Sequence, residues 1–129
     1  MNYLKLDENL QGRCRYSRKL ANNTYAERRD DGILAIRLHK TDILKFHRSG
    51  AVTYDTGGWR TRTTKSRMNE YGKQGVYVYQ QNGVWMLKHD GESYVFRDGI
   101  TVGEAGVSTD RGTLLTSEDG KEDAENKKK

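Results

Sequence analysis

The sequence predicts an α+β fold dominated by β-structure, in which two antiparallel β-meanders are joined by a short basic helix and close into a small barrel or a sheet roll. Short runs of alternating apolar and polar residues recur along the chain, as they do in half-buried strands. Asn-Gly and Asp-Gly pairs separate several of these runs, and such pairs favour two-residue hairpin turns because the turn residues need positive φ. A single helical pattern lies between the two sets of strands.

The composition limits the chain to one small domain. It has 129 residues, of which 33% are hydrophobic, and its mean hydropathy is −0.99, so the predicted core is small. Cys14 is the only cysteine, which excludes an internal disulfide. No apolar run is long enough for a membrane span, and the N-terminus does not resemble a signal peptide. We therefore expect an intracellular protein with no membrane partner.

Charge is distributed unevenly along the chain. Residues 1–89 hold 17 Lys and Arg against 8 Asp and Glu, whereas residues 90–129 hold 6 against 10. A basic body favours a polyanionic partner. From this asymmetry and the strand signals we predict three parts: a basic N-terminal arm (1–22), a single β-rich globular domain (23–103) with a short helix near 64–72, and a flexible acidic tail (104–129).

The arm carries a cluster of basic residues without an intervening acid. The cluster consists of Arg13, Arg15, Arg18 and Lys19, with Tyr16 among them. A basic patch that contains an aromatic residue is typical of nucleic-acid contacts. A solvated arm without a binding function has the same pattern, and the sequence leaves both interpretations open.

Four strands are predicted before the helix. Leu34, Ile36 and Leu38 alternate with other residues, which gives one buried and one exposed face. Glycine-containing turn signals lie at 30–32, before these residues, and at 48–50, after the next apolar run. The predicted strands cover residues 24–29, 34–38, 43–46 and 51–55.

A glycine turn at 57–58 leads into the predicted helix. Thr63 or Thr64 is placed to cap the first turn of this helix, and Gly72 is placed to end it. Trp59 lies between the turn and the helix. We expect it to be buried as a structural anchor, because large aromatic side chains must supply much of the bulk of so small a core.

The helix region is basic, with five Lys and Arg residues and one acid in residues 60–73. Basic side chains beside threonine hydroxyls at a helix N-terminus form a binding site for phosphate or another anion. A solvated helix beside a buried tryptophan is the other interpretation. The residues that would bind the anion are Arg60, Arg62, Thr64, Lys65 and Arg67.

A second meander is predicted after Gly75, with strands over 76–79, 84–88, 94–97 and 100–102. Tyr77 and Tyr79 lie on one face of its first strand, opposite two valines. An exposed tyrosine face would stack bases, as aromatic residues on sheet surfaces do in single-strand binders. Because the chain has few aliphatic residues, we expect the tyrosines to fill the core instead.

His39 and His47 each follow a hydrophobic residue and precede x-Thr or x-Ser. Two such motifs build the site of two-histidine phosphoesterases, in which one histidine is the base and the other the acid. There the motifs come from distant parts of a longer chain, whereas here they are eight residues apart. We therefore expect no enzymatic activity. The histidines also lack the spacing of a metal site, and no cofactor motif is present, so we expect no metal and no cofactor.

Three stretches carry a resemblance to known proteins: Lys19 to Thr24, Arg37-Leu38-His39-x-Thr41-Asp42, and the run Gly57-Gly58-Trp59-Arg60-Thr61-x-Thr63-Thr64-Lys65-x-Arg67-Met68-Asn69. Together they resemble a family of small bacteriophage proteins without an assigned activity, over about residues 17–72. The resemblance implies a phage origin and a location in the cytoplasm of the infected bacterial host. It supplies no catalytic residues.

We therefore expect a small non-enzymatic phage accessory protein that binds nucleic acid through a basic face, in regulation, replication or host takeover. The alternative is an inhibitor of a host enzyme or antiviral defence system, which would bind an acidic host protein or a nucleotide signal. The residues expected to meet phosphates are Arg13, Arg15, Arg18, Lys19, Arg60, Arg62, Lys65 and Arg67. Trp59 and Tyr16 would be available to stack.

Residues 117–129 contain no aliphatic residue larger than alanine, so they offer almost nothing to bury. Deleting them should leave the melting temperature nearly unchanged, as measured by thermal denaturation of the full and shortened chains. A fall of many degrees would show that this segment docks on the domain.

Overall fold

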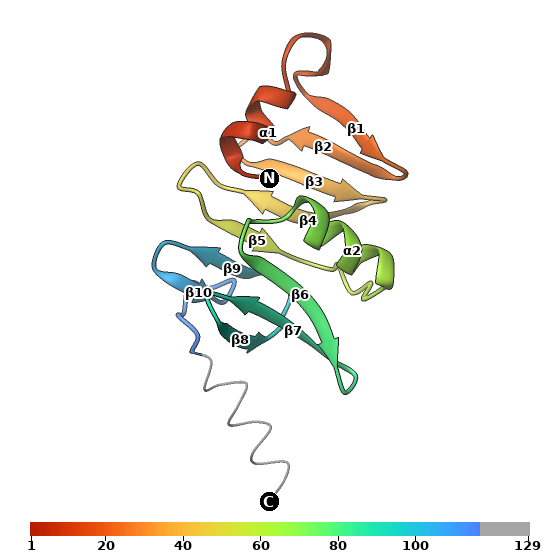
Figure 1. The fold of residues 1–129 in the computed structure, drawn as a ribbon. Coiled ribbons are helices and arrows are strands. Elements are labelled where there is room, and N and C mark those ends of the chain that lie inside the picture. The colour runs from red at the N-terminus through yellow and green to blue at the C-terminus, as the bar shows by residue number, and fades with distance from the viewer. Residues whose placement is uncertain (117–129) are drawn as a thin grey trace, which may run out of the picture.

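The computed structural model describes residues 1–116 and contains two antiparallel sheets and two α-helices in that range (Figure 1). The predicted α+β, β-dominated fold is thereby confirmed, although neither sheet closes into a barrel. The later part of the tail predicted over 104–129 lies outside the described residues.

The larger sheet has seven strands in the order β1-β2-β3-β4-β5-β9-β10. These strands are β1 (Ser17–Ala21), β2 (Thr24–Arg28), β3 (Leu34–Leu38), β4 (Thr41–Phe46), β5 (Val52–Tyr54), β9 (Ile100–Gly103) and β10 (Gly106–Ser108). The smaller sheet has three strands, β6 (Val76–Gln81), β7 (Val84–His89) and β8 (Glu92–Val95), in that order.

The hairpin turns follow the chemistry that the sequence predicts. At 82–83, between β6 and β7, Asn82 has φ 53° and Gly83 has φ 79°. At 90–91, between β7 and β8, Asp90 has φ 53° and Gly91 has φ 78°. Both residues of each pair therefore adopt the left-handed conformation that a tight hairpin needs.

The strand predicted over 100–102 belongs to the larger sheet and not to the second meander. It is β9, and it pairs with β5 through Val52 and Val102 and through Tyr54 and Ile100. Ile100 and Val102 are fully buried there. The prediction placed this strand beside its neighbours in sequence because local patterning does not specify which strand a segment pairs with.

The N-terminal residues predicted as a separate arm are part of the domain. They form α1 (Tyr3–Asn9), a 3₁₀ turn η1 (Gly12–Cys14) and β1. Leu6 and Leu10 are completely buried, and β1 pairs with β2 up to Ala21 and Thr24. No boundary between an arm and the domain falls at residue 22, because β1 and β2 are the two strands of one hairpin. β10 likewise extends the sheet beyond residue 103.

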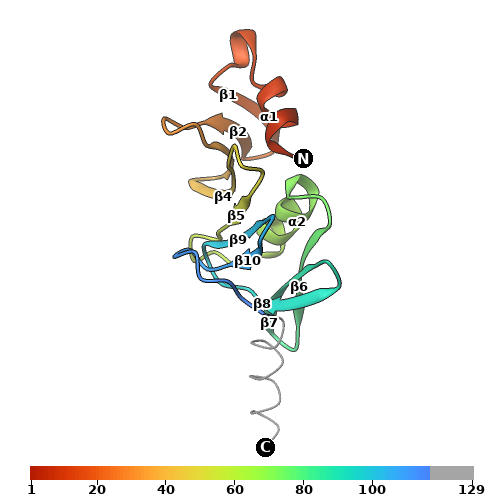
Figure 2. The same ribbon diagram turned by 90° about the vertical axis from the view of Figure 1, so that its left-hand side faces the viewer.

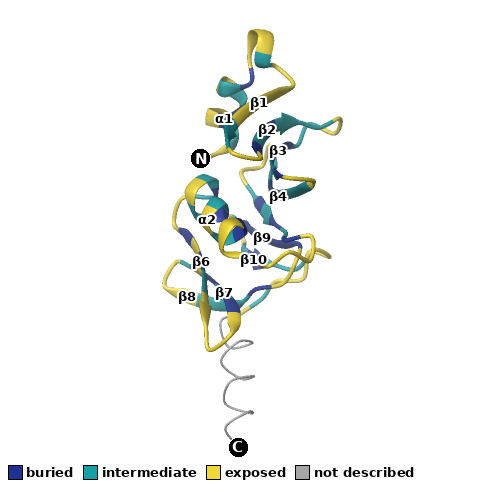
Figure 3. Cartoon of the chain, turned by 90° about the vertical axis from the view of Figure 1, so that its right-hand side faces the viewer, coloured by how far each residue is buried: buried dark blue, intermediate teal, exposed yellow. Residues whose placement is uncertain are grey.

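Both helices lie on the same side of the larger sheet (Figure 2). The helix predicted near 64–72 is α2 (Arg62–Tyr71), and Gly72 ends it as expected. Its cap is Thr61, which accepts a hydrogen bond from the Thr64 amide, and not Thr63 or Thr64. Met68 faces the core, and buried residues gather where α2 meets the strands (Figure 3).

Tyr54 lies at the junction of β5, α2 and β9. Its ring is completely buried, its hydroxyl accepts a 2.9 Å hydrogen bond from the Lys73 amide, and its carbonyl accepts one of 2.8 Å from the Gly99 amide. Burial raises the pKa of the phenol above its usual value. Gly72 packs so closely that a Cβ there would lie 2.6 Å from the Tyr54 oxygen.

Tyr54→Phe should lower the free energy of unfolding by about 1–2 kcal/mol, because the Lys73 amide loses its acceptor in a partly buried place. Urea denaturation of the variant measures the change. Tyr77→Phe is the matched control: Tyr77 is exposed, so its stability should stay within about 0.5 kcal/mol of the parent. Equal stability of the two variants would contradict the assigned role of Tyr54.

Candidate functional site

The basic residues predicted in the N-terminal segment do not share one face. Arg18 and Lys19 follow each other in β1, so their side chains point to opposite faces of the sheet. Arg18 donates to the Asn9 carbonyl of α1 over 3.4 Å, on the side that the helices cover. Lys19 lies opposite Tyr25, on the side without helices. The N-terminal cluster is therefore split between two surfaces.

Arg13 and Arg15 lie in and after η1, at the end of the molecule farthest from the smaller sheet (Figure 1). Both are exposed. Arg15 lies over the ring of Tyr16 at 5.1 Å from its centroid. The structure thus separates this basic group from the one at α2.

Three of the four basic residues predicted near α2 have structural contacts. Arg60 and Lys65 lie over the buried ring of Trp85, at 5.8 and 5.4 Å from its centroid. Arg67 donates to the Thr24 hydroxyl over 3.0 Å and pairs with Glu70 at 3.2 Å. Arg62 is exposed, and its side chain has no hydrogen-bond, ion-pair or ring partner among the described residues.

Thr64 was predicted to bind an anion, but it is only 3% exposed. Its hydroxyl donates to the Trp59 carbonyl over 3.1 Å and bonds the Thr61 hydroxyl over 3.0 Å. The hydroxyl thus holds the entry of α2 in place, and its hydrogen-bonding capacity is used within the chain.

The expectation that Trp59 is a buried anchor is wrong. Its side chain is 70% exposed, whereas Trp85 of β7 is 5% exposed and packs against Phe96. The reason is the preceding turn, in which Gly57 and Gly58 have φ 60° and 89°. Trp59 follows this turn in the loop before α2 and belongs to neither a strand nor a helix, so no element places its indole in the core.

The expectation that the tyrosines of β6 fill the core is also wrong. Val76 and Val78 are the buried residues of this strand, and Tyr77 is 56% exposed. Tyr77 and Tyr79 stack with centroids 6.0 Å apart and ring planes at 17°. Other side chains fill the core, including Leu6, which belongs to the segment that the sequence predicted as an arm.

A groove runs between α2 and β6. It has a volume of about 500 Å³ and is lined by Arg62, Lys65, Ser66, Asn69, Tyr77, Val78, Tyr79 and Gln80. The Asn69 side chain joins its two walls, donating to the Val78 carbonyl over 2.8 Å and accepting from the Val78 amide over 2.7 Å. Tyr79 is fixed by a 2.9 Å bond to the Ser93 hydroxyl. We call this feature the α2–β6 groove.

A second hollow lies on the other flank of α2. It also has a volume of about 500 Å³, and mostly apolar surface lines it. Its walls are the turn between β3 and β4, the loop before α2 and the first turn of α2. The lining residues are Leu38, His39, Lys40, Thr41, Ile43, Thr56, Trp59, Thr61, Thr63 and Thr64. We call it the Trp59 pocket.

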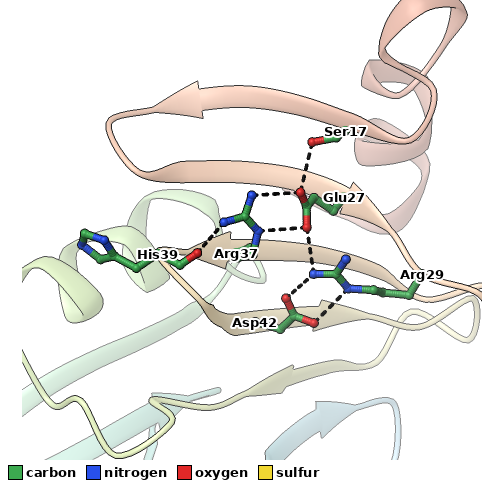
Figure 4. Close-up of polar contacts among 6 residues, drawn as sticks. All are labelled: Ser17, Glu27, Arg29, Arg37, His39 and Asp42. Atoms are coloured by element: carbon green, nitrogen blue, oxygen red, sulfur yellow. Dashed lines mark hydrogen bonds and ion pairs between the residues drawn. The ribbon is translucent and has the colours of Figure 1, made fainter.

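The helix-free face of the larger sheet carries an ion network centred on Glu27 (Figure 4). Arg37 donates to both Glu27 oxygens over 2.9 and 3.0 Å, and Arg29 joins Glu27 to Asp42. The Arg37 hydrogen bonds, with those of Ser17 and Arg29, lower the pKa of Glu27 to about 2. The two arginine charges on this face are thus balanced by two carboxylates. No local sequence pattern indicates this network, because its members meet only through strand pairing.

His39 and His47 do not share a site. His39 is exposed in the β3–β4 turn, and His47 follows the far end of β4. His47 bonds the Thr53 hydroxyl over 2.9 Å, and burial lowers its pKa. Asp42, which lies three residues after His39, accepts from the Arg29 guanidinium.

Within residues 1–116, no cluster of three or more His, Cys, Asp or Glu side chains is arranged to hold a metal ion. The helices of this range are also too short or too polar to cross a membrane.

Comparison with known proteins gives one family. The model of the Kyanoviridae Gp96 protein family matches residues 7–103. No curated protein and no solved structure matches significantly. The matched range covers most of the chain and includes both hollows beside α2.

Replacing Glu27 should reveal how much the network stabilises the sheet. Because the folded-state pKa of Glu27 lies below its ordinary value of 4.5, its contribution is present above pH 4.5 and is lost as pH falls toward about 2. Glu27→Gln should lower the unfolding free energy by about 1–3 kcal/mol at neutral pH and weaken the loss of stability below pH 4.5. Denaturation curves across this range measure both. Glu8→Gln, at an exposed position of α1, should change neither.

Proposed function

The chain belongs to the Kyanoviridae Gp96 family of bacteriophage proteins, and we propose that it is a non-enzymatic accessory protein that binds single-stranded nucleic acid in the α2–β6 groove. Its work in the infected host would lie in regulation, replication or host takeover. The observation that carries the proposal is that one groove is lined both by a stacked tyrosine pair, of which Tyr77 is exposed and Tyr79 is half-buried, and by basic side chains.

The aromatic part of the groove suits unpaired bases. Tyr77 offers an exposed ring face, and Tyr79 is held beside it by its bond to Ser93. Aromatic side chains on a sheet surface bind single strands by stacking on bases, which a duplex keeps stacked on each other. This chemistry accepts any base, so we expect weak sequence preference.

The basic part of the groove suits the phosphate backbone. Arg62 is exposed with no side-chain partner among the described residues, and Lys65 lies one turn further along α2 on the same flank. Ser66 and Asn69 add hydrogen-bonding groups on this flank. The acid of this helix, Glu70, lies on another flank, where it pairs with Arg67. No carboxylate lines the groove.

Variants of the groove test the proposal. We expect a labelled single strand of about 12 nucleotides to bind more tightly than a duplex of equal length, as measured by fluorescence anisotropy. Tyr77→Ala should weaken binding about fivefold or more, because stacking on one aromatic ring contributes roughly 1–3 kcal/mol per base. Arg62→Glu should weaken binding to all sequences and reduce the slope of log K against log salt by roughly 0.7 per lost phosphate contact.

Arg13→Glu is the matched control, because it makes the same charge change at the other end of the molecule. It should leave affinity nearly unchanged. An equal loss of affinity in Arg13→Glu and Arg62→Glu would assign binding to net charge and not to the groove. If the parent protein binds no single strand even at low salt, the proposal fails, and an inhibitor that binds an acidic host protein becomes the leading hypothesis.

A further inference from the structure

We propose that the Trp59 pocket binds a nucleotide, with the base stacked on the Trp59 indole and the phosphate held by Lys40 and the nearby threonine hydroxyls. This site is separate from the α2–β6 groove and does not depend on it. The proposal stands on four features of the pocket: an exposed indole on a fixed backbone, a rigid opposite wall, an apolar floor and polar groups without partners.

The backbone at Trp59 is fixed although its ring is not packed. The Trp59 amide donates to the Thr56 carbonyl over 2.9 Å. The Trp59 carbonyl accepts from the Thr61 amide over 3.1 Å and from the Thr64 hydroxyl over 3.1 Å. The backbone therefore holds a 70% exposed indole beside the pocket, where it offers a flat surface for stacking.

The loop that presents Trp59 is itself held at several points. Asp98 accepts from both the amide and the hydroxyl of Thr56, over 2.8 and 2.7 Å. Asp55 accepts from the Gly57 amide over 2.7 Å, and the Thr56 hydroxyl accepts from the Gly58 amide over 3.2 Å. The loop therefore forms one wall of the pocket without help from a ligand.

The opposite wall is the β3–β4 turn. His39 has φ 54°, and Arg37 donates to its carbonyl. The turn contacts the Trp59 loop directly: a Cβ on Gly57 would lie 2.8 Å from the Thr41 side chain. Only a residue without a side chain fits there, so Gly57 fixes the distance between the two walls.

The floor of the pocket is apolar. Leu38 is 5% exposed and Ile43 is 1% exposed. The pairing of β3 with β4 shifts so that Ile43 has no partner residue in β3, which is a β-bulge. A volume of about 500 Å³ lies within the range of small-molecule sites. The floor and the indole together favour a planar ring, because its faces can pack against apolar surface.

Several polar groups at this pocket have no hydrogen-bond or ion-pair partner among the described residues. They are the Lys40 ammonium and the hydroxyls of Thr41 and Thr63. The first turn of α2 begins at the pocket and adds the positive end of the helix dipole. These groups favour an anion attached to the ring. A nucleotide, either free or at the end of a strand, combines a planar heteroaromatic ring with such an anion.

Titration with AMP, GMP, CMP and UMP tests this site. The readout is the indole N–H signal of Trp59 in nitrogen-15 NMR spectra, assigned by comparison with Trp59→Phe. We expect saturable shifts with at least one nucleotide and a smaller response to adenosine or inorganic phosphate alone. Trp59→Ala should lower the affinity, measured by calorimetry, about fivefold or more, and Trp59→Phe should retain part of it. Lys40→Ala should weaken AMP binding but not adenosine binding.

Tyr77→Ala separates the two proposals, because it alters the groove and should leave mononucleotide affinity unchanged. Competition by a single strand with a terminal phosphate, but not by one without, would identify the end of a strand as the ligand; no competition would identify a free nucleotide. The proposal is overturned if no nucleotide shifts the Trp59 signal saturably, or if Trp59→Ala, shown to be folded by circular dichroism, binds nucleotide as tightly as the parent.

Discussion

The arrangement of this protein depends most on the contacts of Tyr54, whose side chain is buried. Its side-chain hydroxyl accepts a hydrogen bond from the Lys73 amide at the end of α2, and its backbone carbonyl accepts one from the Gly99 amide before β9. Gly72 must lack a side chain for α2 to end so close to the phenol. This contact sets the end of α2 against the larger sheet just before the chain enters β6. The helix consequently lies between the two sheets, with a hollow on each flank.

The two hollows use different residues of the same helix. Arg62, Lys65 and Asn69 are spaced three and four residues apart and face β6, whereas Thr63 faces the β3–β4 turn. One flank is therefore basic beside stacked tyrosines, and the other is more apolar and has an exposed indole in its lining. The two proposed ligands differ correspondingly. A nucleic-acid single strand needs a long charged surface, whereas a small planar anion needs a more enclosed site. The chemistry of each flank thus points to a ligand of matching shape.

Features that depend on neighbouring residues could be predicted from the sequence, whereas features that depend on residues far apart in the chain could not. The hairpins at Asn82-Gly83 and Asp90-Gly91 are determined by the conformational needs of two residues, so they could be predicted. The pairing of β9 with β5 depends on residues far apart in the chain, which no local pattern specifies. The same applies to the site: Lys65 and Arg62 were identified from their charge, but the exposure of Trp59 and Tyr77 follows from which residues fill the core. Leu6 and Leu10 fill part of the core, although the sequence predicts that their segment is a basic arm.

Packing explains most of the residues around the Trp59 pocket, and the few that it does not explain favour binding. Gly57 is required by its contact with Thr41, and Thr64 is required by its bonds to the helix entry. Trp59 and Lys40 have no such structural reason. A large indole that is 70% exposed contributes little to the core and presents apolar surface to water. Its fixed backbone shows that this exposure is set by the loop and does not arise from local disorder. A ligand that covers the ring would gain the stacking energy that the folded chain itself leaves unused.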